Sequence, residues 1–179
     1  MTRLLLAASV AFTFAAVPLG TSGALAAGSP SSSKIKCGKG RVPDRSGKKC
    51  VRVKSSLDDD TLIEGARDLA YGGRYDEALQ ALDLVRDQDD VRVLGYRGFA
   101  TRKSGRMEEG LGYYRAALKA DPDYTLVREY MGEAFLEMGD VPAAEEQLAE
   151  IERRCGKECR EYALLSSAIK THKLLNPGS

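Results

Sequence analysis

The sequence has very little of the chemistry that enzymes use. Its 179 residues include one histidine, His172, and no tryptophan. There is no serine nucleophile motif, and no cluster of metal-ligating side chains. A phosphate-binding loop at Gly47-Lys48 would need a glycine where Val42 stands and a Ser or Thr at Lys49. The acidic residues stand at helix-surface spacing, not in an apolar setting that would raise a pKa. These absences argue against an enzyme, so neither a catalytic residue nor a cofactor is predicted.

Cysteine is also scarce, and the four residues fall into two local pairs, Cys37 with Cys50 and Cys155 with Cys159. An even number of cysteines in an oxidising compartment indicates disulfides, and spacing favours these pairs among the three connectivities that four cysteines allow. A zinc site would need two closely spaced pairs, whereas twelve residues separate Cys37 from Cys50. A thiol-redox motif would need two residues between Cys155 and Cys159, where the sequence has three. No metal site is therefore predicted.

Long apolar runs are confined to the N-terminus. One basic residue precedes the apolar residues 4–19, and small residues follow up to Ala26. This arrangement predicts a secretory signal peptide at residues 1–26, cleaved after Ala26. A retained membrane helix is the alternative, but Pro18 and Gly20 interrupt the run. We therefore expect an exported protein, in a bacterial periplasm or outside the cell, where disulfides form.

The charge is unevenly distributed along the chain. The whole chain carries a net charge of +1, but Lys34–Lys54 contains nine Lys or Arg against one Asp, a net +8. Residues 27–56 are predicted to be a linker and a basic loop closed by Cys37–Cys50, with short strands at Gly40–Val42 and Cys50–Val53. This basic loop either lies on the acidic remainder of the chain or contacts an anionic envelope surface.

The rest of the sequence is organised in repeated units. In the unit Val91–Pro122, two amphipathic segments flank Gly105, and Gly98 and Gly110 are small residues that let the segments approach closely. The turn glycine recurs at Gly73 and Gly139, which lie 32 and 34 residues from Gly105. This register resembles the tetratricopeptide repeat, which pairs two antiparallel helices in about 34 residues.

The resemblance implies an all-α fold: a right-handed superhelical array of three helix pairs, a C-terminal capping helix and a small disulfide-closed N-terminal arm. Stacked units share cores that no single pair could form. Residues 57–155 would hold the three units, at about 58–90, 91–123 and 124–155, followed by the capping helix at 156–175 and a tail at 176–179. The pair Cys155–Cys159 would then join the third unit to the capping helix.

In this family the first helices of the units line a concave groove that takes extended peptides or partner helices. The resemblance places eight candidate peptide-binding residues there: Arg67, Tyr71, Arg92, Phe99, Arg102, Lys103, Glu129 and Glu133. The first two units supply cations and aromatic rings and the third supplies acids, so a groove with two oppositely charged walls is expected. The alternative interpretation is that these residues are only the solvated face of amphipathic helices.

A clamp on a peptide's terminal carboxylate is the family's best-known groove chemistry. The clamp positions are occupied here by Ile63, Arg67, Tyr96, Leu126 and Tyr130. Only Arg67 is charged, so such a clamp is not expected.

These observations predict an exported adaptor that binds a peptide or partner helix in its groove and does not bind nucleic acid. Arg102→Glu and Phe99→Ala are expected to abolish binding without unfolding the chain. The alternative function is envelope anchoring, in which the basic loop Lys34–Lys54 binds anionic lipid or cell-wall polymer and the repeats serve as a support.

Overall fold

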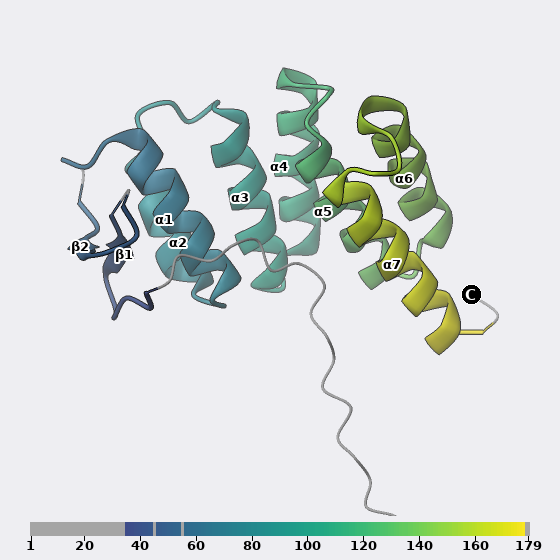
Figure 1. The fold of residues 1–179 in the computed structure, drawn as a ribbon, viewed down its shortest axis with the longest axis horizontal. Helices are drawn as coiled ribbons and strands as arrows, with labels where there is room; N and C mark the ends of the chain where they lie inside the picture. Colours follow the sequence, from purple (N-terminus) through teal and green to yellow (C-terminus); the bar gives the residue numbers. More distant parts are fainter. Residues whose placement is uncertain (1–34, 45, 55, 178–179) are drawn as a thin grey trace, which may run out of the picture.

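The computed structural model describes residues 35–44, 46–54 and 56–177. The predicted signal peptide, residues 1–26, lies outside these residues. Within them the chain forms a two-stranded hairpin followed by seven helices (Figure 1). No helix in these ranges has the length and apolar character needed to cross a membrane.

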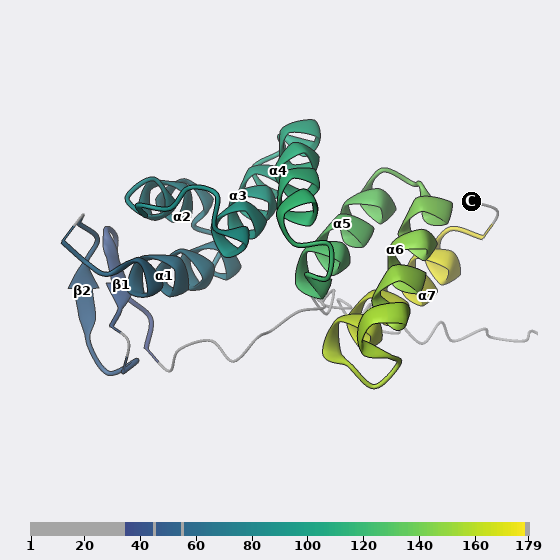
Figure 2. The same cartoon turned by 90° about the horizontal axis from the view of Figure 1, so that it is seen from above.

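The first six helices form three antiparallel pairs. The pairs are α1 (Asp59–Tyr71) with α2 (Tyr75–Leu82), α3 (Val91–Lys103) with α4 (Met107–Ala120), and α5 (Thr125–Glu137) with α6 (Val141–Cys155). A seventh helix, α7 (Arg160–Leu175), packs against both α5 and α6. In Figure 2, α1 and α3 follow one another along one side of the array, with α2 and α4 on the other side. The predicted array of three helix pairs and a final helix is confirmed.

Each pair turns at the glycine that the repeat register predicts. Gly73, Gly105 and Gly139 have φ angles of 75°, 89° and 79°, in the left-handed region that strains any residue with a side chain. The residue after each glycine donates its amide to the carbonyl five positions back, at 2.9, 3.1 and 2.8 Å. The same local geometry therefore ends the first helix of every unit.

Glycine also sets how closely α3 and α4 approach. A Cβ atom built at Gly98 would lie 2.4 Å from the ring of Tyr114, and one built at Gly110 would lie 2.9 Å from the carbonyl oxygen of Gly98. Neither distance is sterically allowed. The middle unit thus depends on glycine at both facing positions, and the Tyr114 ring fills the space beside them, fully buried.

The basic loop forms a hairpin of strands β1 (Arg41–Pro43) and β2 (Cys50–Arg52), which pair antiparallel with Val42 opposite Val51. β1 lies one residue later than expected and β2 ends one residue earlier. The predicted Cys37–Cys50 disulfide is present and closes this arm.

The hairpin lies on the first helix pair. Val42 is fully buried, and Gly65 of α1 gives it room, since a Cβ at Gly65 would lie 2.5 Å from the Val42 side chain. Arg74 donates hydrogen bonds to the carbonyl oxygens of Cys37 and Gly38, at 2.7 and 3.0 Å. The arm therefore covers the outer end of the array through an apolar contact and backbone bonds, not through its cationic side chains.

The C-terminal end is closed by α7. Cys155, the last residue of α6, is bonded to Cys159, which directly precedes α7. Leu165 of α7 is fully buried against Gly132 of α5, where a Cβ would approach the leucine side chain to 2.5 Å. The disulfide thus stands at the corner where the third pair passes into the final helix.

Candidate functional site

The inner helices α1, α3 and α5 share a row of aromatic side chains, which we call the aromatic row: Tyr71, Tyr96, Phe99 and Tyr130. The ring of Tyr71 is nearly perpendicular to the rings of Tyr96 and Phe99. The centroid of the Tyr71 ring lies 6.4 Å from that of Tyr96 and 5.3 Å from that of Phe99. Phe99 in turn lies 5.0 Å from Tyr130. Pairs at these distances and tilts are favourable beyond the area they bury. The aromatic row therefore joins all three units along the side predicted to form the groove.

The hydroxyl groups of Tyr71 and Tyr130 are hydrogen-bonded to each other, which brings α1 into contact with α5 across α3. Burial is the main cause that raises the pKa of Tyr71, to about 12. Both hydroxyls therefore stay protonated at neutral pH, and each can donate or accept a hydrogen bond. Tyr71 remains half-buried whereas Tyr130 is buried, so Tyr71 is the accessible end of the aromatic row.

Tyr96 and Tyr130 are not among the peptide-binding residues predicted from the sequence. Both are buried members of the aromatic row. The signal was available in the repeat register, because these tyrosines stand 34 residues apart, the same spacing that separates Gly105 from Gly139. A tyrosine repeated at equivalent positions of neighbouring units indicates a shared contact rather than two separate ones.

Arg102 is not on an open groove. Its side chain is 0% exposed, and its guanidinium contacts Glu133 at 3.0 Å and Glu137 at 2.8 Å. It also donates to the Tyr114 hydroxyl at 3.3 Å and lies 5.6 Å from the centre of the Phe99 ring. Burial opposes its charge, but the neighbouring phenol and carboxylates outweigh burial and raise the pKa of Arg102. Arg102 thus joins α3 to α4 and α5.

The two oppositely charged walls predicted for the groove neutralise each other. In addition to the ion pairs of Arg102, the ammonium group of Lys103 lies 2.6 Å from the carboxylate of Glu137. Arg102 and Lys103 of the second unit are therefore paired with Glu133 and Glu137 of the third across the α3–α5 contact. Among the predicted peptide-binding residues, Arg102, Phe99 and Glu129 are only 2%, 9% and 2% exposed, so they offer little surface to a ligand.

Glu129 is a buried carboxyl group beside Glu133. Burial raises the pKa of Glu129 well above its usual range, and the charge of Glu133 and a hydrogen bond with it raise the pKa further, whereas Arg102 opposes the shift. Glu161 of α7 acts in the same direction as Glu133. The shift favours the protonated form of Glu129, so we expect this carboxyl group to present no negative charge to a ligand at neutral pH.

We expect the Glu129 carboxyl to make the protein less stable as pH rises. The pKa of Glu129 in the folded state lies above the ordinary value of 4.5, which applies to the unfolded state. At a pH between the unfolded-state and folded-state pKa values, the folded state therefore holds a proton that the unfolded state releases. The free energy of unfolding should therefore fall as pH increases through this window. Glu129→Gln should raise the urea midpoint at about pH 8 and flatten its dependence on pH. Glu146→Gln, an exposed change on α6, is the control; equal pH slopes for both variants would contradict the assignment.

Three of the predicted cations keep accessible side chains. Arg67, Arg92 and Lys103 are 28%, 42% and 32% exposed. Arg67 pairs with its neighbour Asp68 at 3.0 Å. These cations come from α1 and α3, the helices that carry Tyr71 and Phe99. With the half-buried Tyr71 and Glu133 they are the accessible part of the predicted site.

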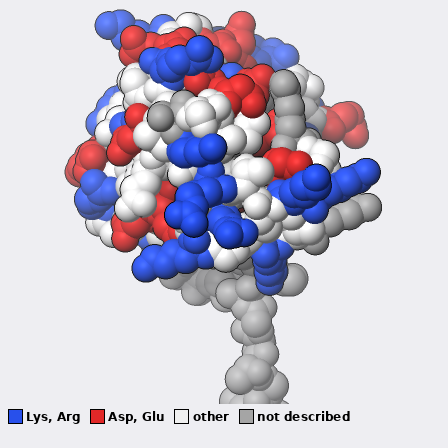
Figure 3. Space-filling view, turned by 90° about the vertical axis from the view of Figure 1, so that its left-hand side faces the viewer, with Lys and Arg blue, Asp and Glu red and all other residues white. Residues whose placement is uncertain are grey.

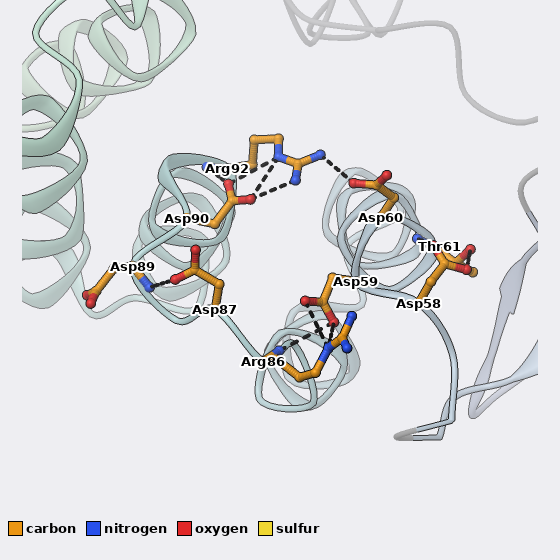
Figure 4. Close-up of polar contacts among 9 residues, drawn as sticks. All are labelled: Asp58, Asp59, Asp60, Thr61, Arg86, Asp87, Asp89, Asp90 and Arg92. Carbon is orange, nitrogen blue, oxygen red and sulfur yellow. Dashed lines mark hydrogen bonds and ion pairs between the residues drawn. The ribbon is translucent and has the colours of Figure 1, made fainter.

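Arg92 is positioned by the acidic residues at the start of the inner helices. It contacts Asp90, which caps α3, at 2.6 Å and Asp60, in the first turn of α1, at 2.9 Å. Figure 4 shows the guanidinium lying between these carboxylates, and Arg86 similarly bonded to Asp59. The pair with Asp60 links α1 of the first unit to α3 of the second, and together with the pair to Asp90 it holds Arg92 at one end of the inner face.

The described residues contain one cluster of potential metal ligands, and its chemistry does not suit a metal ion. Cys155, Cys159 and Glu161 place a ligand atom each within 4.8 Å of one another. Both sulfur atoms belong to the disulfide. Since zinc takes thiolates, this cluster lacks its donors.

Comparison with known proteins agrees with this architecture. Residues 102–169 match the family model of the tetratricopeptide repeat. The structure of the type III secretion translocator chaperone SycD of Yersinia enterocolitica is similar, with a TM-score of 0.55 and 20% identity over 68% of this chain and 90% of that chain. SycD in complex with a peptide of the translocator YopD gives a TM-score of 0.53 and 19% identity over 65% and 89%.

At these identities the likeness to SycD shows a shared fold. No curated protein sequence matches the chain at a significant level. The matched segment runs from the end of α3 to α7, and the α1–α2 pair before it turns at Gly73 with the same geometry as Gly105 and Gly139 within it. Residues 102–169 thus contain tetratricopeptide repeat sequence, and the chain as a whole has the fold of such repeats.

Proposed function

We propose that this protein is an exported adaptor, not an enzyme, that binds a peptide or a partner helix on the inner face of α1, α3 and α5. The observation that carries the proposal is the aromatic row, with Tyr71 at its accessible end and Arg67 and Arg92 beside it on the same helices. Tyrosine and arginine are the residues that most often dominate the binding energy of interfaces. The structure of SycD with a peptide of YopD supports the same use of the fold.

The Tyr71–Tyr130 contact restricts how a ligand can bind. Because these hydroxyls meet across α3, a peptide either lies over the aromatic row or displaces this hydrogen bond with its own backbone groups. Arg102 is fully buried, whereas Arg67 and Arg92 are 28% and 42% exposed on α1 and α3, although each is also paired with an acid. The inner face therefore suits a peptide that combines an apolar side chain with a carboxylate.

Peptide binding is tested by selecting peptides from a random display library on the disulfide-bonded protein and measuring their affinity by fluorescence anisotropy. Tyr71→Ala and the double change Arg67→Ala with Arg92→Ala should each weaken binding by at least about tenfold, as expected for anchor residues. Arg115→Ala is the matched control, because Arg115 is exposed on the outer helix α4. Affinity that is unchanged in the inner-face variants, or equally reduced by Arg115→Ala, would reject the inner face as the binding site.

Export is supported by the two disulfides, since such bonds persist in oxidising compartments. The intact mass of the protein isolated from its native cells should correspond to a chain without residues 1–26 and with no free thiol. A full-length, reduced chain in the cytoplasmic fraction would contradict export.

A further inference from the structure

The hairpin presents an unusual amount of positive charge at the end of the array. Docking through Val42 leaves its basic side chains in solvent. Those exposed among the described residues are Lys36, Lys39, Arg41, Lys48, Lys49, Arg52 and Lys54. Figure 3 views this end and shows a run of Lys and Arg side chains across the middle of the face. The charge is thus displayed to solvent at the outer end of the array.

Part of this charge surrounds a cleft between the hairpin and α2. The cleft has a volume of about 490 Å³. Its walls combine three cations of the hairpin with two apolar side chains and one amide: Lys39, Arg41, Arg52, Val53, Gln80 and Leu84. The cleft therefore offers positive charge beside an apolar strip, with Gln80 as a further hydrogen-bonding group.

Arg41 and Arg52 stand directly opposite each other in the two-stranded sheet. Like charges at directly opposed positions of antiparallel strands destabilise the pairing. Among the residues that the structure describes, neither arginine has a carboxylate partner. The hairpin thus keeps two repelling guanidinium groups at the mouth of a cleft, an arrangement that an anion between them would relieve.

The nearby carboxylates do not supply that anion, because each has other partners. Glu77 is bonded to Arg74 at 2.6 Å and to a hairpin amide at 2.7 Å, and the Arg74 bond is the main cause that lowers the pKa of Glu77 to about 2. Asp83 pairs with Arg97 at 2.7 Å. Asp44 accepts hydrogen bonds within the hairpin turn.

We propose that this cleft binds the phosphate group of a phosphate ester. A carboxylate has two oxygens with which to accept hydrogen bonds, whereas the three terminal oxygens of a phosphate monoester can accept from Arg41, Arg52 and Lys39 at once. The carbon part of the ester lies along Val53 and Leu84. The ester is either a soluble molecule or the head group of an anionic lipid, since both present the same phosphate chemistry to the cleft.

The test uses the disulfide-bonded protein and two double variants of equal charge. Arg41→Gln with Arg52→Gln removes the opposed pair, and Lys48→Gln with Lys49→Gln removes two exposed charges from the hairpin turn, which does not line the cleft. Glycerol phosphate is titrated by calorimetry, and sedimentation is measured with phosphatidylcholine vesicles with and without phosphatidic acid. The arginine variant should lose at least about tenfold in affinity for one of these probes, and the lysine variant much less.

Each outcome decides the proposal. Arginine-dependent binding of glycerol phosphate supports it with a soluble ester as the source, and arginine-dependent binding of only the phosphatidic acid vesicles supports it with a lipid head group. Equal losses of affinity in the two variants would mean that binding depends only on diffuse charge attraction, and would overturn the cleft as the binding site. Binding of poly-glutamate as tight as that of the phosphate probes, or no binding of any probe, would also overturn it. Far-UV circular dichroism and peptide binding by both variants check that the fold and the inner face are intact.

Discussion

Replacing Phe99 with alanine should lower the free energy of unfolding by about 3–5 kcal/mol, the usual cost of deleting a buried phenylalanine side chain. Phe99 lies at the centre of the aromatic row, between Tyr71 and Tyr130, and Arg102 lies over its ring. Its loss would leave a cavity between the three inner helices. Urea unfolding followed by circular dichroism at the helix band measures the effect.

Tyr113→Ala is the matched control, since Tyr113 is a half-buried aromatic residue on the outer helix α4. Its replacement should cost about 1 kcal/mol or less, as for most substitutions outside a packed core. A Phe99→Ala protein that kept its stability but lost peptide binding would show that Phe99 contacts the ligand and does not support the fold.

Arg102→Met should cost about 3 kcal/mol, near the lower end of what is lost when one partner of a buried ion pair is removed. Methionine keeps much of the apolar stem but leaves Glu133 and Glu137 without their guanidinium, and it removes the bond to Tyr114. The carboxylates retain some exposure, at 18% and 38%, so water compensates part of the loss. The urea midpoint is again the measurement.

Lys103→Met provides the comparison for Arg102→Met, because Lys103 shares Glu137 but is itself exposed. Exposed pairs contribute about 0–1 kcal/mol, so its replacement should have little effect. Similar losses in the two variants would mean that the α3–α5 charges act as an exposed network, and that Arg102 has no special role in joining the helices.

The repeat architecture could be predicted because its determinants are local. A glycine with positive φ at Gly73, Gly105 and Gly139 marks each turn, and small residues such as Gly98 and Gly110 mark where helices approach. The two disulfides could be predicted without knowledge of the fold, because each joins cysteines that lie close together in the sequence. Each of these features is determined within one unit or between adjacent segments.

The extent to which the inner-face residues are buried could not be predicted in the same way. The repeat register places Phe99, Arg102 and Glu129 on the inner side of their helices, but their burial depends on how closely α3, α5 and the neighbouring units approach. The curvature of the array determines this distance, and curvature is the sum of small rotations between units. A single unit therefore contains no signal that separates a ligand-facing arginine from one that is paired inside.

The way in which the basic loop docks on the first helix pair also could not be predicted from the sequence. Its composition suggested attraction between Lys34–Lys54 and acidic repeats, whereas the contact depends on one valine, Val42, and on backbone carbonyls that Arg74 binds. Strands of three residues are too short for an alternating pattern to reveal the buried position.

The hydrogen bond between Tyr71 and Tyr130 also has a consequence for cooperativity. In a linear repeat array each unit interacts only with its neighbours, so stability is a sum of nearest-neighbour terms and the ends can fray separately. Tyr71 belongs to the first unit and Tyr130 to the third, so their contact adds a term between units that are not adjacent. A disturbance at one end of the array can therefore reach the other end through this bond as well as through the contacts between neighbouring units.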